Sequence, residues 1–251
     1  VINVEKPGVG DDSRHMDIEF GIAERLDFGD APAPYPSLLA ANAARHRFDP
    51  QLRLGNQWDA ELDGLPAAAA DGDDHAQLDD EDGVTFLTSL EPGQDAQVRL
   101  VAGGNGTLDA WADFNADGDW TDAGEHIISD RALATGVYDV TFPVPLGANI
   151  GNTFARFRLS SVQNVAPAGH ALAGEVEDYA VLVLSDEPVA NPDSYEVAQD
   201  AINVVLEVLV NDFPSSTLLL AITTVTQPPR GSVRISADRQ TLLYSPDRGI
   251  V

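Results

Sequence analysis

Oxygen-bearing side chains recur at short, regular spacing between residues 111 and 125, in the sequence W-A-D-F-N-A-D-G-D-W-T-D-A-G-E. Asp113, Asn115 and Asp117 occupy alternate positions, and Gly118 follows them directly. An EF-hand-type calcium loop begins in this way, with oxygen ligands at alternate positions and a glycine at the sharp turn. The spacing therefore predicts a calcium site in this loop.

The second half of the loop departs from the EF-hand pattern. Asp119 stands where a backbone carbonyl is the usual ligand, and the final carboxylate comes one residue late, at Glu125. We expect the chain to leave the loop along a strand, so that Glu125 still reaches the ion. Calcium is the expected cofactor because it accepts about six to eight oxygens in flexible geometry, whereas magnesium requires a stricter octahedron. The alternative is a solvated acidic turn without an ion.

A second acidic segment lies between residues 71 and 82 and includes Asp71, Asp73, Asp80 and Asp82. Carboxylates packed together at low dielectric repel one another strongly unless a cation lies among them. Two interpretations stay open, a second calcium-binding region and a flexible acidic loop. The surrounding residues show little sustained periodicity, which predicts long ordered loops, and such loops are commonly functional.

The segment G-E-V-E-D-Y near residue 175 carries three more carboxylates. Alternation places Glu175 and Glu177 on one face of a strand and Asp178 on the other, and it turns Arg156 and Arg158 outward from theirs. Exposed cross-strand pairs between the arginines and glutamates, each worth under about 1 kcal/mol, are one interpretation. The other is that Glu175, Glu177 or Asp178 completes a calcium shell begun elsewhere.

The composition restricts the partners. The 251 residues carry a formal net charge of −27, which makes nucleic acid and anionic membranes poor partners and divalent cations suitable ones. The absence of cysteine excludes disulfides and thiolate metal sites. No apolar run reaches the length of a membrane span, so we expect no membrane insertion.

No catalytic motif stands out. The five histidines show no metal-binding spacing, and neither H-E-x-x-H nor G-x-S-x-G occurs. His46 is expected to be a hydrogen-bonded loop histidine rather than a catalytic base. Trp58 lies in a loop where a sugar ring could stack on it. We therefore expect a noncatalytic protein and keep glycan binding through Trp58 as an alternative.

From residue 84 onward, hydrophobic residues alternate with a period of two in seven short segments separated by Gly, Pro, Asn and Asp. The segments are 84–87, 96–101, 107–114, 125–128, 137–142, 153–159 and 176–184. Short strands at this spacing predict an all-β fold, an antiparallel β-sandwich with long acidic loops.

Six motifs in order resemble the GEVED domain of large secreted bacterial proteins. They are L-D-F-G-D-A-P at 26–32, A-R-H at 44–46, D-E-D-G-V at 80–84, W-A-D-F-N-A-D-G-D-W at 111–120, R-F-R-L-S at 156–160 and G-E-V-E-D-Y at 174–179. The resemblance covers about residues 26–184. It implies an extracellular β-rich module of a bacterial surface protein, without established catalytic activity, whose partners are other domains of the same protein.

A proline-rich polar link at 185–192 leads into a second domain. Its V-L-V-N-D, T-Q-P-P-R-G-S-V and Y-S-P segments resemble bacterial cadherin-like Ig repeats. In such repeats further strands follow the Y-x-P turn, so the resemblance implies an Ig-like sandwich that lacks its last strands. The residues before 25 resemble the end of a prealbumin-like B-type adhesin repeat. They would alternatively serve as a docking or donor arm for a neighbouring copy.

The predicted organisation has three parts. Residues 1–24 are the terminal strands of a preceding domain or an arm, 25–185 a GEVED-like β-sandwich, and 186–251 an incomplete Ig-like sandwich. We expect a noncatalytic, calcium-stabilised extracellular module that serves adhesion, matrix or filament assembly. One alternative is a carbohydrate-binding module of a secreted hydrolase, and another is a filament subunit that self-assembles by strand exchange.

Overall fold

The computed structural model describes residues 26–58, 60–72, 80–185, 187–215 and 219–249. The predicted strands or arm at 1–24 and the predicted ligand Asp73 lie outside the described residues. Within them, the chain forms strands and a short 3-10 helix, η1 (Leu39–Ala41). The all-β prediction is confirmed.

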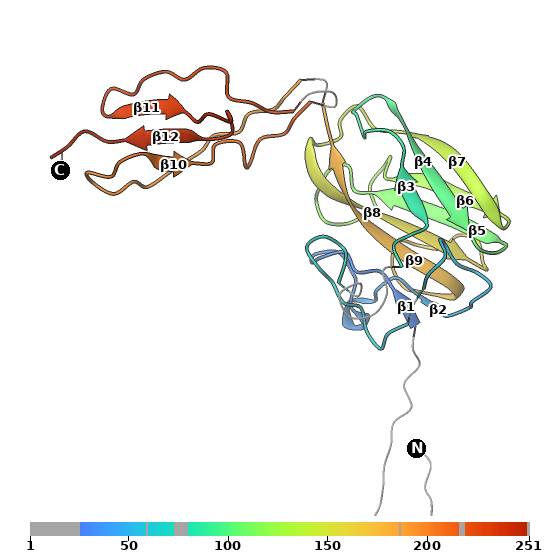
Figure 1. The fold of residues 1–251 in the computed structure, drawn as a ribbon. Coiled ribbons are helices and arrows are strands. Elements are labelled where there is room, and N and C mark those ends of the chain that lie inside the picture. Colours follow the sequence, from blue (N-terminus) through green and yellow to red (C-terminus); the bar gives the residue numbers. More distant parts are fainter. Residues whose placement is uncertain (1–25, 59, 73–79, 186, 216–218, 250–251) are drawn as a thin grey trace, which may run out of the picture.

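Nine strands build the larger part of the molecule as two sheets that pack face to face (Figure 1). They are β1 (Leu26–Phe28), β2 (Arg45–Arg47), β3 (Val84–Phe86), β4 (Asp95–Ala102), β5 (Gly106–Ala112), β6 (His126–Leu133), β7 (Gly136–Pro143), β8 (Gly151–Ser160) and β9 (His170–Val183). One sheet has the order β1-β2-β9-β8-β5-β6 and the other the order β3-β4-β7. Each of the seven strands predicted from residue 84 onward is present.

The region before β3 differs from the expectation of loop alone. It contributes β1 and β2, and β2 pairs with β9 in parallel, so the sandwich is not wholly antiparallel. Strand β9 also begins earlier than predicted, at His170, because its first residues pair with β2 and β8. The whole G-E-V-E-D-Y segment therefore lies within a strand.

The hydrophobic core lies between the two sheets. Alternating residues of β4 and β7, such as Leu100 and Phe142, face the inner side chains of β5 and β8. As the alternation in β8 predicts, Ala155, Phe157 and Leu159 all belong to this core. The period of two thus correctly assigns the inner face of the strand.

The prediction that Arg156 and Arg158 lie outward in solvent is wrong. Both lie on the face of β8 opposite the core, yet they are only 0% and 1% exposed. The expected pairing with glutamates does not form, because the β8–β9 register sets Arg156 opposite Asp178. Arg156 donates to this carboxylate from Nε at 2.7 Å and from Nη2 at 2.6 Å, and its guanidinium lies 4.3 Å over the Trp120 ring.

Asp178 also fixes the segment that covers this face. Its Oδ2 accepts a hydrogen bond from the Ala31 backbone N–H at 2.9 Å, which attaches the L-D-F-G-D-A-P segment to the sheet. The approach is so close that a Cβ on Gly29 would lie 2.5 Å from the same oxygen. A buried charge is tolerated when it is paired and hydrogen-bonded. The covering segment and the ion pair therefore depend on each other.

Residues 187–249 carry a separate small sheet. Its strands are β10 (Val204–Leu206), β11 (Ser232–Ile235) and β12 (Leu242–Ser245), in the order β10-β12-β11. The described residues around 195 and over 219–226 form no strand. No hydrophobic side chain described in this part is buried, and Val210 and Leu219 are 77% and 95% exposed. Without a packed face, segments with strand-like sequences gain little from pairing.

We expect Asp178→Asn to destabilise the sandwich by about 3 to 5 kcal/mol, because it leaves the buried Arg156 guanidinium without its counter-charge. The matched control is Asp139→Asn, which breaks the Arg99–Asp139 pair, whose side chains are 49% and 41% exposed. That substitution should change the free energy of unfolding by under about 1 kcal/mol. Urea denaturation measures both, and equal effects would contradict the role given to Asp178.

Candidate metal centres

The loop at 113–125 joins two neighbouring strands. Asp113 follows β5 directly and Glu125 precedes β6 directly, so the chain leaves the loop along a strand, as expected. The Ala112 N–H donates to the Glu125 carbonyl at 2.9 Å and closes the base of the loop. Gly118 has a φ of +93°, a conformation that side-chain-bearing residues rarely adopt, at the sharp turn where the pattern requires glycine.

Asp113 and Glu125 form the buried base of the loop, with exposures of 0% and 2%. One Asp113 oxygen accepts from the Tyr35 hydroxyl at 2.6 Å and from the Gly118 N–H at 2.9 Å. Glu125 accepts from the Phe114 N–H at 3.1 Å. Burial raises the pKa of Glu125 to about 7, and the Asp113 charge adds to this effect. Both carboxylates therefore hold the backbone of the loop in place.

The rim of the loop carries three exposed carboxylates, those of Asp117, Asp119 and Asp122. Each offers an oxygen within 4.8 Å of the others. The Asn115 amide donates to Asp122 at 2.7 Å and to Asp117 at 3.1 Å, and so joins two of them. The structure thus gathers Asp117 and Asp119 of the predicted ligands, with Asn115 beside them, while the other two predicted ligands lie at the base.

Asp122 is the rim residue that the predicted ligand set lacks. Asp122 follows the turn at Gly118. The EF-hand spacing requires no carboxylate at its position. The only sequence feature that could have indicated this ligand is its acidic side chain within T-D-A-G-E. Its backbone N–H donates to Glu125 at 3.2 Å, which holds it over the base of the loop.

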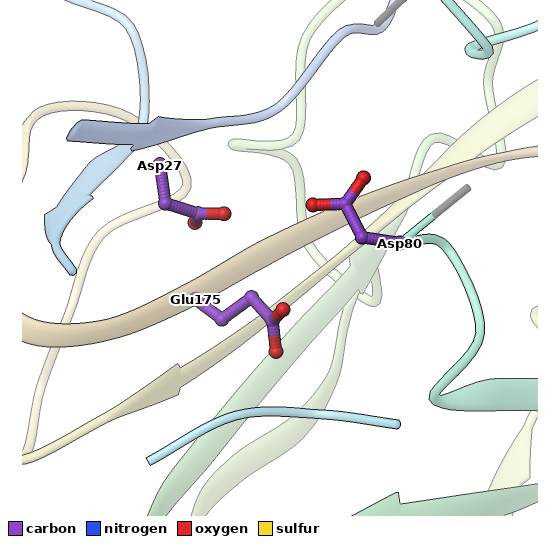
Figure 2. A group of neighbouring side chains, drawn as sticks. All are labelled: Asp27, Asp80 and Glu175. Atoms are coloured by element: carbon purple, nitrogen blue, oxygen red, sulfur yellow. The ribbon is translucent and has the colours of Figure 1, made fainter. Parts of the chain in front are cut away.

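A second cluster of carboxylates lies inside the domain, where Asp27 of β1, Asp80 ahead of β3 and Glu175 of β9 meet. Each offers an oxygen within 4.8 Å of the others, and their exposures are 3%, 6% and 2% (Figure 2). Burial raises the pKa of Asp27 well above its ordinary value, and the charge of Glu175 adds to it. Burial also raises the pKa of Glu175 well above its ordinary value, with a further contribution from Glu177.

The backbone around β9 holds Glu175 in this position. One of its oxygens accepts from the Leu54 N–H, and the Val176 N–H donates to Asp27 at 2.5 Å. Gly174 allows β9 to pass close to its neighbours, since a Cβ there would lie 2.0 Å from the Leu159 carbonyl oxygen. The first glycine of G-E-V-E-D-Y is therefore required by packing.

Glu177 has a different role from Glu175. Its two oxygens accept from the Gly83 N–H at 2.8 Å and from the Tyr179 hydroxyl at 3.1 Å. It is 1% exposed and lies in neither carboxylate cluster found among the described residues. Glu177 thus fastens the D-E-D-G-V segment to β9. The three acids of G-E-V-E-D-Y thus have different roles: Glu175 belongs to a carboxylate cluster, Glu177 binds a backbone N–H, and Asp178 forms an ion pair.

The remaining predicted ligands are spread apart. Asp82 accepts from the Asn56 N–H at 2.8 Å, and neither it nor Asp71 belongs to a cluster of the described residues. Among the acids of 71–82 that the structure describes, Asp80 alone joins one. Asp27 is absent from the predicted ligands although it stands in the first of the six motifs, because no local spacing links it to residues 80 and 175.

Trp58, the predicted glycan contact, is partly buried against Phe48, with ring centroids 3.8 Å apart. The hollow beside it is also lined by Leu52, Arg53 and Glu175. One face of the indole is thus covered by Phe48.

His46 is fully buried, and both of its ring nitrogens form hydrogen bonds. Its Nε2 must accept from Arg158 Nε at 3.0 Å, because a guanidinium has no acceptor, and Nδ1 then donates to the Leu172 carbonyl at 3.0 Å. This arrangement selects the neutral imidazole. Burial, aided by the Arg158 charge, lowers the pKa of His46 well below its ordinary value.

We expect His46 to make folding pH-dependent. The unfolded chain protonates this residue near its ordinary pKa of about 6.5, whereas the folded state excludes the proton. The free energy of unfolding should therefore fall as the pH drops below about 6.5, by about 1.4 kcal/mol per pH unit for this residue. His46→Gln keeps one donor and one acceptor without titrating and should lack this component. Urea denaturation at several pH values tests this, and identical pH dependence in the two proteins would contradict it.

Two family models match the chain in succession. The model of the GEVED domain matches residues 107–182, and that of a bacterial Ig domain matches residues 185–250. Their order agrees with the motifs in the sequence. The search of curated proteins finds no match. In the structure, residues 26–58 and 80–83 pack onto the GEVED match through Asp178 and Glu177, so they belong to the same sandwich.

These two domain types indicate a noncatalytic module of an extracellular surface protein. Among the residues that the structure describes, no helix is both long enough and apolar enough to span a lipid bilayer.

Proposed function

We propose that this pair of modules, a GEVED-type domain followed by a bacterial Ig-type domain, is a calcium-stabilised segment of a bacterial surface protein. Its role would be to hold neighbouring domains of that protein in a fixed arrangement for adhesion or matrix assembly. One observation carries the calcium part of the proposal. The rim carboxylates of Asp117, Asp119 and Asp122 converge within 4.8 Å on a loop of EF-hand-like sequence.

The electrostatics of the loop favour a cation. Three exposed carboxylates at this distance repel one another, and a divalent ion placed among them removes the repulsion. The whole chain carries a net charge of −27, so a cation is also attracted over longer distances. Sites with exposed ligands and flexible loops bind calcium weakly, which suits the high calcium concentration outside cells.

An ion in this loop would stabilise more than the loop itself. Asp113 at its base bonds to the Tyr35 hydroxyl, and Tyr35 packs against Trp120 with ring centroids 4.4 Å apart. The loop therefore contacts the segment that follows β1 as well as β5 and β6. Fixing the loop would stiffen one end of the sandwich, which is the mechanical property that a module in a series of domains requires.

We expect calcium to raise the thermal stability of the chain, and the double substitution Asp117→Asn/Asp119→Asn to reduce that gain. An ion that binds only the folded state stabilises it by about 2.7 kcal/mol at a hundredfold excess over Kd. The loop's share of the gain should vanish in the double variant, while magnesium should have a smaller effect on the wild-type chain. Thermal unfolding in calcium, magnesium and chelator measures this.

The control for this test is Asp193→Asn/Asp247→Asn, which removes the same charge from two exposed positions far along the sequence. It separates ion binding from a general reduction of the net negative charge, and it should keep the full calcium response. A calcium response that survives undiminished in the loop double variant would rule out the loop as the binding site.

A further inference from the structure

We infer that Asp27, Asp80 and Glu175 form a second, interior site for a divalent cation of the calcium class, separate from the loop at 113–125. The three residues come from β1, from the segment that leads into β3, and from β9. Figure 2 shows their carboxylates turned toward one another from three different parts of the chain. Each contributes an oxygen within 4.8 Å of the others.

The unsatisfied oxygen of Glu175 points to a ligand. One oxygen of its carboxylate accepts from Leu54, but Oε1 is buried and has no hydrogen-bond partner among the described residues. Buried polar atoms are nearly always satisfied, because a group removed from water without a partner is costly. Glu177, on the same strand and equally buried, has a donor for each oxygen. Of these two glutamates, only the one that faces the cluster has an unsatisfied oxygen.

No salt bridge among the described residues neutralises Asp27 or Glu175, although the charge of Arg158 acts on Asp27. Within the described part of the chain, neither residue forms an ion pair, whereas Asp178 nearby pairs fully with Arg156. Both nitrogens of His46, which lies against Gly174, are occupied by Arg158 and Leu172. A bound cation would give the unsatisfied Glu175 oxygen a partner of opposite charge.

The ligand chemistry selects the class of ion. The site offers carboxylate oxygens, and the chain contains no cysteine, so hard cations are favoured over zinc or copper. Oxygens lie about 2.3 to 2.6 Å from calcium, so two oxygens of one shell are at most about 5 Å apart. The cluster, with its oxygens within 4.8 Å, fits such a shell. A magnesium shell, with bonds of about 2.1 Å, is narrower.

The interior ion would have a distinct structural consequence. It would join β1 and the segment before β3 to β9, three parts of the chain that are far apart in sequence. The covering layer formed by residues 26–58 and 80–83 would then depend on the ion, in addition to its contacts with Asp178 and Glu177. The loop at 113–125 contacts this layer at a different place, through Tyr35.

Counting bound calcium on the full chain tests the inference. Equilibrium dialysis should give two ions per chain for the wild type, one for Glu175→Gln and one for Asp117→Asn/Asp119→Asn. Glu177→Gln is the matched control, a buried glutamate of the same strand outside the cluster, and should keep both ions. If Glu175→Gln binds as much calcium as the wild type, the interior site is overturned. If Asp117→Asn/Asp119→Asn binds as many calcium ions as the wild type while Glu175→Gln loses one, the loop site of the proposed function fails and the interior site stands.

Terbium luminescence keeps the test decisive if Glu175→Gln does not fold. Trp58 lines the same hollow as Asp27 and Glu175, so it can transfer excitation to a terbium ion held there. In the Asp117→Asn/Asp119→Asn background, tryptophan-sensitised emission should persist, fall on adding Trp58→Phe, and disappear when calcium is added in excess. Absence of sensitised emission from this background would overturn the interior site.

Discussion

The structure depends on the burial of charge at the centre of its larger sheet. Strands β8 and β9 carry five charged side chains that are at most 2% exposed, namely Arg156, Arg158, Glu175, Glu177 and Asp178. One face of a β-sandwich sheet commonly meets water. Here long segments cover Arg156, Arg158 and Asp178 on that face, while Glu175 and Glu177 point to the opposite face and are covered by other segments. Each buried charge needs a partner on the segment that covers it. The fold is in this sense organised by polar contacts as much as by its hydrophobic core.

Three of the short motifs supply hydrogen-bond partners for these buried charges. The L-D-F-G-D-A-P segment brings the Ala31 N–H to Asp178, the A-R-H segment brings His46 to Arg158, and the D-E-D-G-V segment brings the Gly83 N–H to Glu177. The family match begins at residue 107, yet the contacts attach residues 26–58 and 80–83 to it. The covering layer is thus part of the same structural unit.

The two proposed calcium sites differ in their physics. The loop at 113–125 presents exposed carboxylates to solvent, so an ion there would bind readily and stiffen the end of the sandwich. The interior carboxylates of Asp27, Asp80 and Glu175 are buried, so an ion there would be bound together with the closing of the covering layer. Ions at both proposed sites would add rigidity without disulfides, which a chain without cysteine cannot form.

The sequence by itself determined the strands after residue 84, the inner face of β8 and the loop after β5, because each depends on a local period or spacing. It placed Asp80 and Glu175 among possible ligands but did not connect them with Asp27. Only the tertiary structure decided that Arg156 and Arg158 are buried and that these three acids meet. Alternation shows which way a side chain points, but what covers that face is set by segments remote in sequence, which leave no periodic signal.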